Sequence, residues 1–225
     1  MRPKRRDFTK WDIGEGIAAN GELTCSVRNC EATRVKLSAL CGKHLRRQKS
    51  WGHHTGRFIR PRELEPWIGS ARKFIAEQSN HRGIQLALKW FKLRIERAEP
   101  PVVDVRTSPH AELQLKLVLL KSAGVEPEEC LARCIAVWMC AHHLQNVEPE
   151  VVARNLASHV FYSMAPGCRA SKASTKKLFG NQIFDAFLHL FVRIVQYYDA
   201  KVEAAFELYE GSQEPFAGEQ AGGPS

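Results

Sequence analysis

Residues 25–47 of the chain read CSVRNCEATRVKLSALCGKHLRR, and this stretch holds four metal-type side chains in two close pairs. Cys25 and Cys30 can share a short knuckle with a turn between them. Cys41 and His44 lie three positions apart, so one helical turn would place both on one face. Zinc binds four cysteine or histidine ligands in a tetrahedron. We therefore predict a zinc site at Cys25, Cys30, Cys41 and His44; the alternative is a set of scattered buried thiols.

The segment around these residues has few apolar side chains for a fold of its own. A domain of about 40 residues rarely buries enough apolar surface to be stable without a staple. Bound metal supplies folding free energy in such small domains. The apolar residues available here are Leu23, Val27, Val35, Leu37, Leu40 and Leu45. The predicted zinc module over residues 21–60 should therefore depend on its metal.

The positive charge of the chain is concentrated at its N-terminal end. Residues 1–72 hold 16 basic and seven acidic residues, which accounts for the whole net charge of +9. Such a charge asymmetry favours contact with a polyanion at one end of the molecule. Seven basic residues and no acid occur from position 43 to 62, namely Lys43, Arg46, Arg47, Lys49, Arg57, Arg60 and Arg62. We predict that these seven residues bind nucleic acid, in the form of double-stranded DNA; the alternative is a solvated basic segment that aids solubility.

The rest of the sequence predicts a mainly α fold, with the small N-terminal zinc module followed by a helical bundle. From Pro61 onward apolar residues recur at helical spacing. Ser108 before Pro109 is typical of a helix start, and Gly124 of a helix end. A long amphipathic helix is predicted over 181–210. The domains expected are a flexible basic arm (1–20), the zinc module (21–60), a bundle of five to six helices (61–210) and a disordered tail (211–225).

Three strings, CSVRNC (25–30), ALCGKHLRR (39–47) and WGH (51–53), resemble the CxxxxC…GLCxxHxxRxxxxG zinc module of phage and mobile-element proteins. That module often accompanies HNH endonucleases or site-specific DNA-binding parts. The resemblance covers residues 23–54 and implies the same four ligands, with Arg46 and Arg47 as contacts to the DNA backbone. Ala39 stands where the module usually has glycine.

Two further functions stay open as alternatives at this stage. An HNH-like, metal-dependent DNA endonuclease would need a metal-binding His with an acidic partner and a general-base His on a ββα unit. His53-His54 and Asn80-His81 could be its parts, but the segment between them predicts a helix and no Asp-His pair exists. The third reading is a protein–protein adaptor in which zinc is purely structural.

Other cysteines, basic residues and apolar stripes lead to weaker predictions. A second group is made up of Cys130, Cys134, Cys140, His142 and His143. Burial in a core helix is the commoner explanation for it, and a second zinc or an iron–sulfur site is the alternative. The basic loop with Arg169, Lys172, Lys176 and Lys177 is either a second phosphate contact or a solvated linker. The apolar stripe from Phe184 to Phe206 suggests a homo-oligomer or a protein partner. No run of about 18 apolar residues exists, so a soluble, cytoplasmic protein is expected.

Overall fold

The computed structural model describes residues 10–144 and 148–211 and is mainly α-helical, as the sequence predicts. Within these ranges, the side chains of residues 10–12, 167, 195 and 198–211 are not described. The helices are α1 (Lys10–Gly21), α2 (Gly42–Trp51), α3 (Pro61–Glu77), α4 (Arg82–Glu96), α5 (Pro109–Ser122), α6 (Pro127–His143), α7 (Pro149–Phe161), the short 3-10 helix η1 (Pro166–Cys168) and α8 (Ala173–Gly211). None of them, within the described residues, combines the length and the apolar character of a membrane span.

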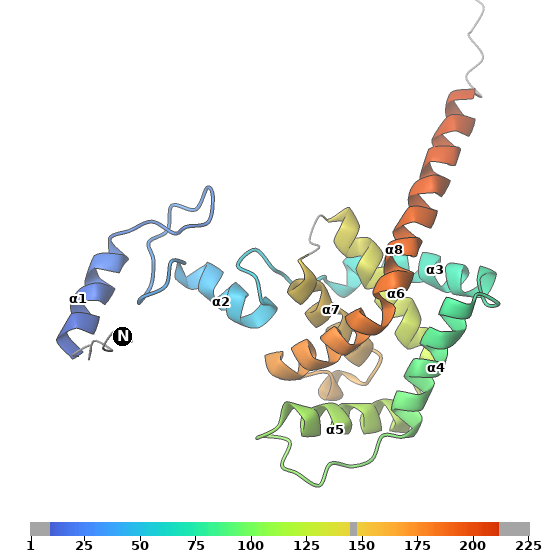
Figure 1. Cartoon of the computed structure of the whole chain (residues 1–225), viewed down its shortest axis with the longest axis horizontal. Coiled ribbons are helices and arrows are strands. Elements are labelled where there is room, and N and C mark those ends of the chain that lie inside the picture. The colour runs from blue at the N-terminus through green and yellow to red at the C-terminus, as the bar shows by residue number, and fades with distance from the viewer. Residues whose placement is uncertain (1–9, 145–147, 212–225) are drawn as a thin grey trace, which may run out of the picture.

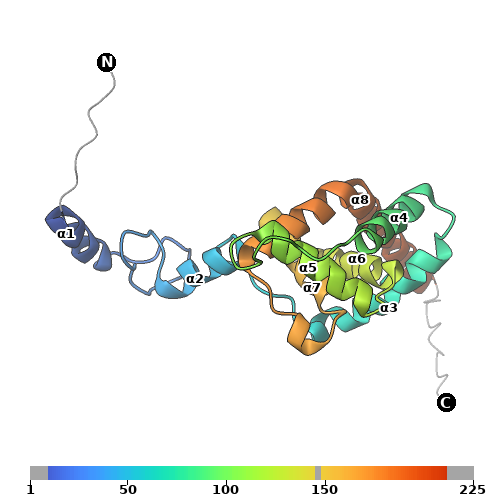
Figure 2. The same ribbon diagram turned by 90° about the horizontal axis from the view of Figure 1, so that it is seen from below.

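The molecule is elongated, because its first two helices project sideways from a helical body. Figures 1 and 2 show α1 and the loops around residue 30 far from the body, with α2 as the bridge between the two parts. Helices α3 to α8 make up the body. The last part of α8 extends away from the body in Figure 1.

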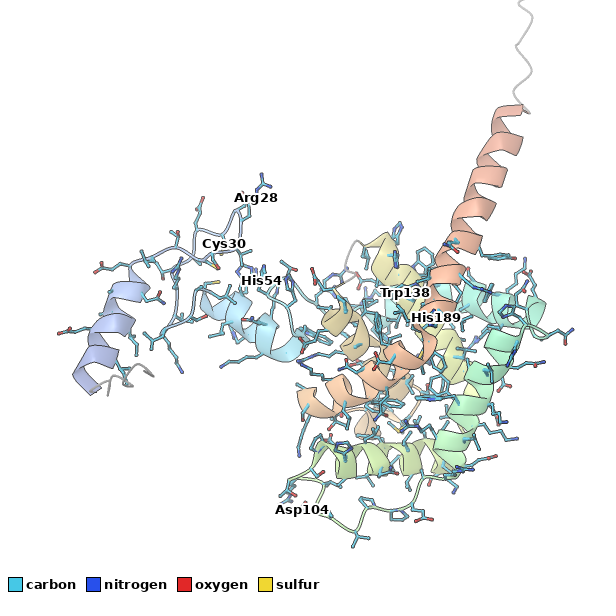
Figure 3. All side chains as sticks on the ribbon, in the orientation of Figure 1. Arg28, Cys30, His54, Asp104, Trp138 and His189 are labelled. Carbon is cyan, nitrogen blue, oxygen red and sulfur yellow. The ribbon has the colours of Figure 1, made fainter. Side chains whose placement is uncertain are left out.

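Helix α6 forms the centre of the helical body. It packs against α3, α4, α7 and α8, and every residue from Cys130 to Ala141 except Arg133 is buried. A helix that is apolar on all faces must be surrounded by other helices. Trp138 of α6 lies inside the body (Figure 3) and stacks on Phe191 of α8, with ring centroids 5.1 Å apart.

Helices α7 and α8 form the closest contact in the body. Gly180 of α8 faces Ala153 of α7, and a Cβ atom at position 180 would lie 1.8 Å from the Ala153 carbonyl oxygen. Only glycine allows the two backbones to approach this closely. Phe179 next to it is fully buried and stacks on Phe161 of α7, with centroids 5.5 Å apart. Tight packing here fixes the first half of α8 on the body.

The predicted start of the last helix was wrong by eight residues, since α8 begins at Ala173. A side chain from another helix explains the earlier start. The Glu112 carboxylate of α5 accepts hydrogen bonds from the Lys172 N–H (3.0 Å) and the Thr175 hydroxyl (2.8 Å). The first bond satisfies a backbone donor that a helix N-terminus leaves free, and the second holds a side chain of the first turn. Lys176 therefore lies on a helix rather than in the predicted loop, and the same holds for Lys177.

The predicted arm over residues 1–20 also differs from the structure. Residues 10–21 form α1, whose end is tied to the next loop because the Asn20 amide donates to the carbonyls of Lys36 (2.8 Å) and Ser38 (2.7 Å). The most basic part of the predicted arm, residues 1–9, lies outside the described residues, as do residues 212–225 of the predicted tail. Two local predictions are confirmed: Ser108 caps α5, and Gly124 adopts a φ of 62° just after it.

Candidate metal centre

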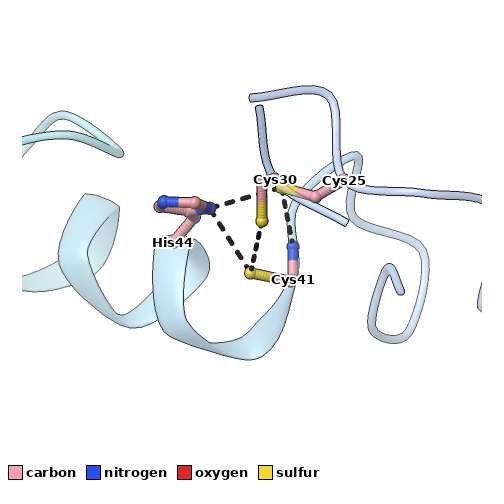
Figure 4. A group of neighbouring side chains, drawn as sticks. All are labelled: Cys25, Cys30, Cys41 and His44. Carbon is pink, nitrogen blue, oxygen red and sulfur yellow. Dashed lines mark hydrogen bonds between the residues drawn. The ribbon is translucent and has the colours of Figure 1, made fainter. Parts of the chain in front are cut away.

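The first ligand pair lies on a knuckle formed by backbone hydrogen bonds. The Cys30 N–H donates to the Val27 carbonyl (3.1 Å), and the Cys25 N–H donates to the Ala32 carbonyl (2.9 Å). Asn29 takes a φ of 60° in the turn, a left-handed conformation that asparagine tolerates better than most residues. The knuckle turns both thiols toward the start of α2 (Figure 4).

The second ligand pair lies at the N-terminus of α2. Cys41 is the N-cap residue, and His44 follows in the first turn, as the predicted helical spacing requires. The positive end of a helix dipole favours a thiolate at the N-cap position. A backbone hydrogen bond from the His44 N–H is the largest influence that lowers the pKa of Cys41 below its ordinary value.

The four ligand atoms form one compact group. All lie within 4.8 Å of one another. His44 Nδ1 is 3.4 Å from both Cys25 Sγ and Cys41 Sγ, and the Sγ atoms of Cys30 and Cys41 are 3.9 Å apart. A disulfide needs about 2.05 Å between sulfur atoms, so these thiols are not bonded. The group could hold one metal ion, with three sulfur ligands and one nitrogen ligand.

Few apolar contacts support this group. Its buried hydrophobic residues are Cys25, Leu40 and Cys41, with Val27, Cys30 and Leu45 packed around them. Two members of the predicted apolar set are largely exposed: Leu23 exposes 50% of its surface and Leu37 exposes 62%. The Cys41 N–H donates to Cys25 Sγ at 3.3 Å, a bond typical of metal-bound thiolates. With so few apolar contacts, metal ligation is the main further interaction available to stabilise this region.

The seven predicted nucleic-acid-binding residues fall into three groups. Lys43, Arg46, Arg47 and Lys49 lie on α2, directly after the metal group. Arg60 and Arg62 flank the start of α3, where they line a hollow of about 610 Å³ together with Arg133 of α6. These six side chains are exposed or half-buried.

Arg57 differs from the other six because an acid already pairs with it. Its Nη1 lies 2.8 Å from Glu63 Oε2, and the same guanidinium is the largest cause that lowers the pKa of Glu63. The sequence places no acid between positions 43 and 62, but the fold brings in one from position 63. Arg57 therefore contributes less free charge than its neighbours on α2.

The joint between α2 and the body depends on residues that the sequence analysis missed. Arg154 of α7 is buried, and its guanidinium donates to the carbonyls of Lys49 (3.0 Å) and Ser50 (2.7 Å). These are the free carbonyls at the C-terminal end of α2, where a cation is favoured. Gly52 ends the helix with a φ of 84°, and a Cβ atom there would lie 2.2 Å from the Glu150 side chain.

The segment over residues 57–60, called the strap below, packs into the helical body, although the predicted zinc module included it. Ile59 is fully buried in the body's core. Asn155 Oδ1 accepts the Ile59 N–H at 2.9 Å, and His159 Nε2 lies 2.8 Å from the Ile59 carbonyl oxygen. Phe58 stacks between Trp51 and His159, with centroid distances of 5.6 and 5.0 Å. The boundary at residue 60 therefore cuts through packed structure.

The second cysteine group has the geometry of core packing. Cys130 and Cys134 are fully buried in α6, and burial raises the pKa of the Cys130 thiol to about 12. Cys140 Sγ contacts the Glu63 carbonyl at 3.7 Å. His142 packs against Trp138, with centroids 4.6 Å apart. In residues 10–144 and 148–211, the only metal-type group of three or more side chains that converges is the one at Cys25, Cys30, Cys41 and His44.

The residues considered for an HNH site do not form a ββα unit. The segment between His54 and Asn80 forms α3, as the sequence predicts, rather than two strands. His81 is the N-cap residue of α4, and its Nδ1 accepts the Gly83 N–H at 3.1 Å. The His53 and His54 rings lie beside each other, 4.1 Å between centroids, in the loop after α2.

Comparison of the chain with protein-family models, with curated proteins and with solved structures gave no match.

Proposed function

We propose that the group at Cys25, Cys30, Cys41 and His44 binds one structural zinc ion. A tetrahedral zinc ion with Zn–S of about 2.3 Å and Zn–N of about 2.0 Å sets S···S edges of about 3.8 Å and S···N edges of about 3.5 Å. The observed edges are 3.9 Å for Cys30 Sγ to Cys41 Sγ, and 3.4 Å from His44 Nδ1 to the Sγ atoms of Cys25 and Cys41. Four protein ligands leave no open position, which is typical of structural rather than catalytic zinc.

We further propose that the protein binds double-stranded DNA through α2 and the start of α3. The observation that carries this proposal is that the metal group fixes the N-terminus of a helix whose next residues are exposed cations. Lys43, Arg47 and Lys49 have no hydrogen bond or ion pair to their charged groups among the described residues. Phosphates neutralised by such side chains release condensed counterions. The resemblance to DNA-associated zinc modules of phage and mobile-element proteins supports the same proposal.

Titration of a labelled DNA duplex with the full chain at several salt concentrations tests this function. With four or five phosphate contacts, the logarithm of the binding constant should fall with the logarithm of salt at a slope of about −4. Replacing Arg46 and Arg47 by Ala should flatten the slope by about two units if both contact phosphate. If both read bases, sequence preference would relax at nearly constant slope. An adaptor with purely structural zinc would show no duplex binding at physiological salt.

The full chain is the right material because the strap over 57–60 packs into the body. Cutting the chain at residue 60 would expose Ile59 and remove the partners of Asn155 and His159. Point substitutions on exposed α2 positions avoid this damage. Incubation of plasmid with the protein and Mg²⁺ tests the endonuclease alternative, which predicts nicked or linear products.

We propose an assembly role for the helical body, with a second copy of the chain as the partner. Leu86, Leu188 and Val192 are 56%, 38% and 45% exposed and line a groove of about 610 Å³ between α4 and α8. Helix α8 continues beyond this groove and leaves the body (Figure 1). Symmetric pairing of identical surfaces is the commonest way in which such a face is covered.

A further inference from the structure

We infer that the nucleic-acid surface crosses from the zinc-binding region onto the helical body, where Lys176 of α8 forms its far end. This inference rests on the proposed nucleic-acid binding and names an additional contact residue for it. Lys176 is 129 positions after Arg47 in sequence, and the fold brings α2 and the start of α8 together. The ligand is the phosphate backbone of the same duplex.

The contact between the two helices lies at Trp51, the last residue of α2. Lys176 Nζ lies 5.9 Å from the centroid of the Trp51 ring. Lys43, Arg47 and Trp51 are spaced four residues apart, so they follow one another along one face of α2. The half-buried tryptophan thus connects a row of cations on α2 with a cation on α8.

The ammonium of Lys176 is available for an external anion, in contrast with its neighbours. In the described part of the chain, this ammonium makes no hydrogen bond or ion pair, and the ring that it contacts is Trp51. Lys177 Nζ pairs with Glu150 at 2.9 Å. Lys172 Nζ donates to the carbonyls of Val105 (2.8 Å) and Arg106 (2.7 Å). The fold therefore uses Lys172 and Lys177 internally and leaves Lys176 for a ligand.

Electrostatics around Lys176 favour an anion. Burial is the largest cause that lowers the pKa of Lys176, and the nearby cations Lys116 and Arg154 lower it further, against an opposing effect of Glu112. A partly buried ammonium that has lost water is stabilised by a negative partner. A phosphate oxygen at this position would provide one without disturbing the pairs made by Lys172 and Lys177.

The spacing between the α2 cations and Lys176 is fixed by buried contacts. Arg154 joins the end of α2 to α7 through the carbonyls of Lys49 and Ser50, and its Nη2 lies 2.7 Å from Glu150 Oε1. Trp51 is stacked on Phe58 at an interplanar angle of 21°. A surface that is already in place before binding does not have to be ordered by the ligand.

Duplex binding by the full chain at several salt concentrations, with single substitutions, tests the inference. We expect K176Q to flatten the salt slope by about one unit and to weaken binding on the order of fivefold at 0.15 M salt. K176R should keep the wild-type slope because it keeps the charge. K89Q is the matched control, because it removes the same net charge at a position that is exposed on α4, away from α2.

The outcomes separate this inference from the proposed function. If wild-type protein binds with a steep salt slope and K176Q behaves like K89Q, the surface ends at α2 and this inference is wrong, while nucleic-acid binding stands. If the wild-type protein does not bind duplex DNA, both are wrong. Equal thermal unfolding of K176Q and wild type excludes loss of fold as the reason for weaker binding.

Discussion

The region around the candidate metal group (residues 22–45, called the metal-binding region below) and the helical body (α3 to α8) differ in the interactions that stabilise them. The first has three buried hydrophobic residues among those described, and two of them, Cys25 and Cys41, belong to the candidate metal group. The second has one core cluster that runs from Ile59 to Ile194 and includes residues of all six helices from α3 to α8. Stability of a small domain therefore rests on a few strong bonds, whereas that of the body rests on many weak contacts.

The joint between the two regions is stabilised by side chains of the helical body. Arg154, Asn155 and His159, all on α7, bind backbone atoms of the preceding strap and of α2. The C-terminal half of α2 is therefore anchored independently of the metal. The difference predicts that loss of metal and damage to α7 will have distinct consequences.

The largest expected effect comes from removing a metal ligand. Freshly purified protein should contain one zinc ion per chain by elemental analysis, and C41S should release it. Residues 22–45 should then unfold, because their own core is too small, while α3 to α8 keep most of the far-UV circular dichroism signal. Hydrogen exchange should show loss of protection before Arg46 and retained protection in α6.

A matched control is C168S, which removes a thiol that lies outside the metal group. It should leave the metal content at one per chain. Wild-type protein without stoichiometric metal would contradict the proposed site, and cooperative unfolding of the whole chain by C41S would contradict the independence of the body.

The next largest effect should be a loss of stability at acidic pH that originates in α7. Burial lowers the pKa of His159 to about 4, and the nearby Arg133 lowers it further, although the contact of Nε2 with the Ile59 carbonyl opposes the shift. Nδ1 has no hydrogen-bond partner within the described residues. The unfolded state binds a proton near pH 6.5, above the folded pKa. The free energy of unfolding should therefore be highest above pH 6.5 and fall by about 3 kcal/mol between pH 6.5 and 4.

Chemical denaturation across this pH range measures the effect, and H159Q provides the comparison. Glutamine can still donate to the Ile59 carbonyl but does not titrate, so the acid-sensitive part of the stability should be reduced. An unchanged pH profile in H159Q would assign the acid sensitivity to other groups.

A smaller effect is expected from the joint itself. R154L removes the two hydrogen bonds to α2 and the pair with Glu150, while Lys177 still neutralises Glu150. Loss of hydrogen bonds from a charged donor should lower the free energy of unfolding by about 2 kcal/mol. The zinc content should stay at one, because no ligand is touched. Thermal unfolding and elemental analysis of the same sample check both results.

Sequence reasoning found the four side chains that converge in the candidate metal group, and most helices, because these features are local. The spacing of Cys25, Cys30, Cys41 and His44 brings the ligands together within 20 positions, and Ser108-Pro109 fixes a helix start by itself. Long-range partners were not predictable in this way. Glu112 starts α8 from 60 residues away, and Arg154 caps α2 from more than 100 residues away. The ion pair of Arg57 with Glu63 was not predicted for the same reason, since Glu63 lies beyond the basic segment.

The smallest effect on folding, and the last test of the comparison, concerns the outer face of the body. Leu86, Leu188 and Val192 are exposed although the body has enough helices to bury its other apolar faces. In sequence, apolar residues continue along α8 at Val195, Val202 and Phe206, whose side chains lie outside those described. An isolated helical segment is marginal in water without packing. We therefore expect the wild-type protein to self-associate at micromolar concentration.

The double variant L188Q/V192Q should lower the mass measured by light scattering toward that of one chain, and leave the unfolding transition of the body nearly unchanged. The reason is that these side chains are already in contact with water in the single chain, so the fold loses little when they become polar. V103Q is the control: Val103 is 60% exposed on the α4–α5 connection, away from the groove, and its replacement should not change the mass. A monomer mass for the wild-type protein would show that the body, unlike the metal-binding region, needs nothing beyond its own chain.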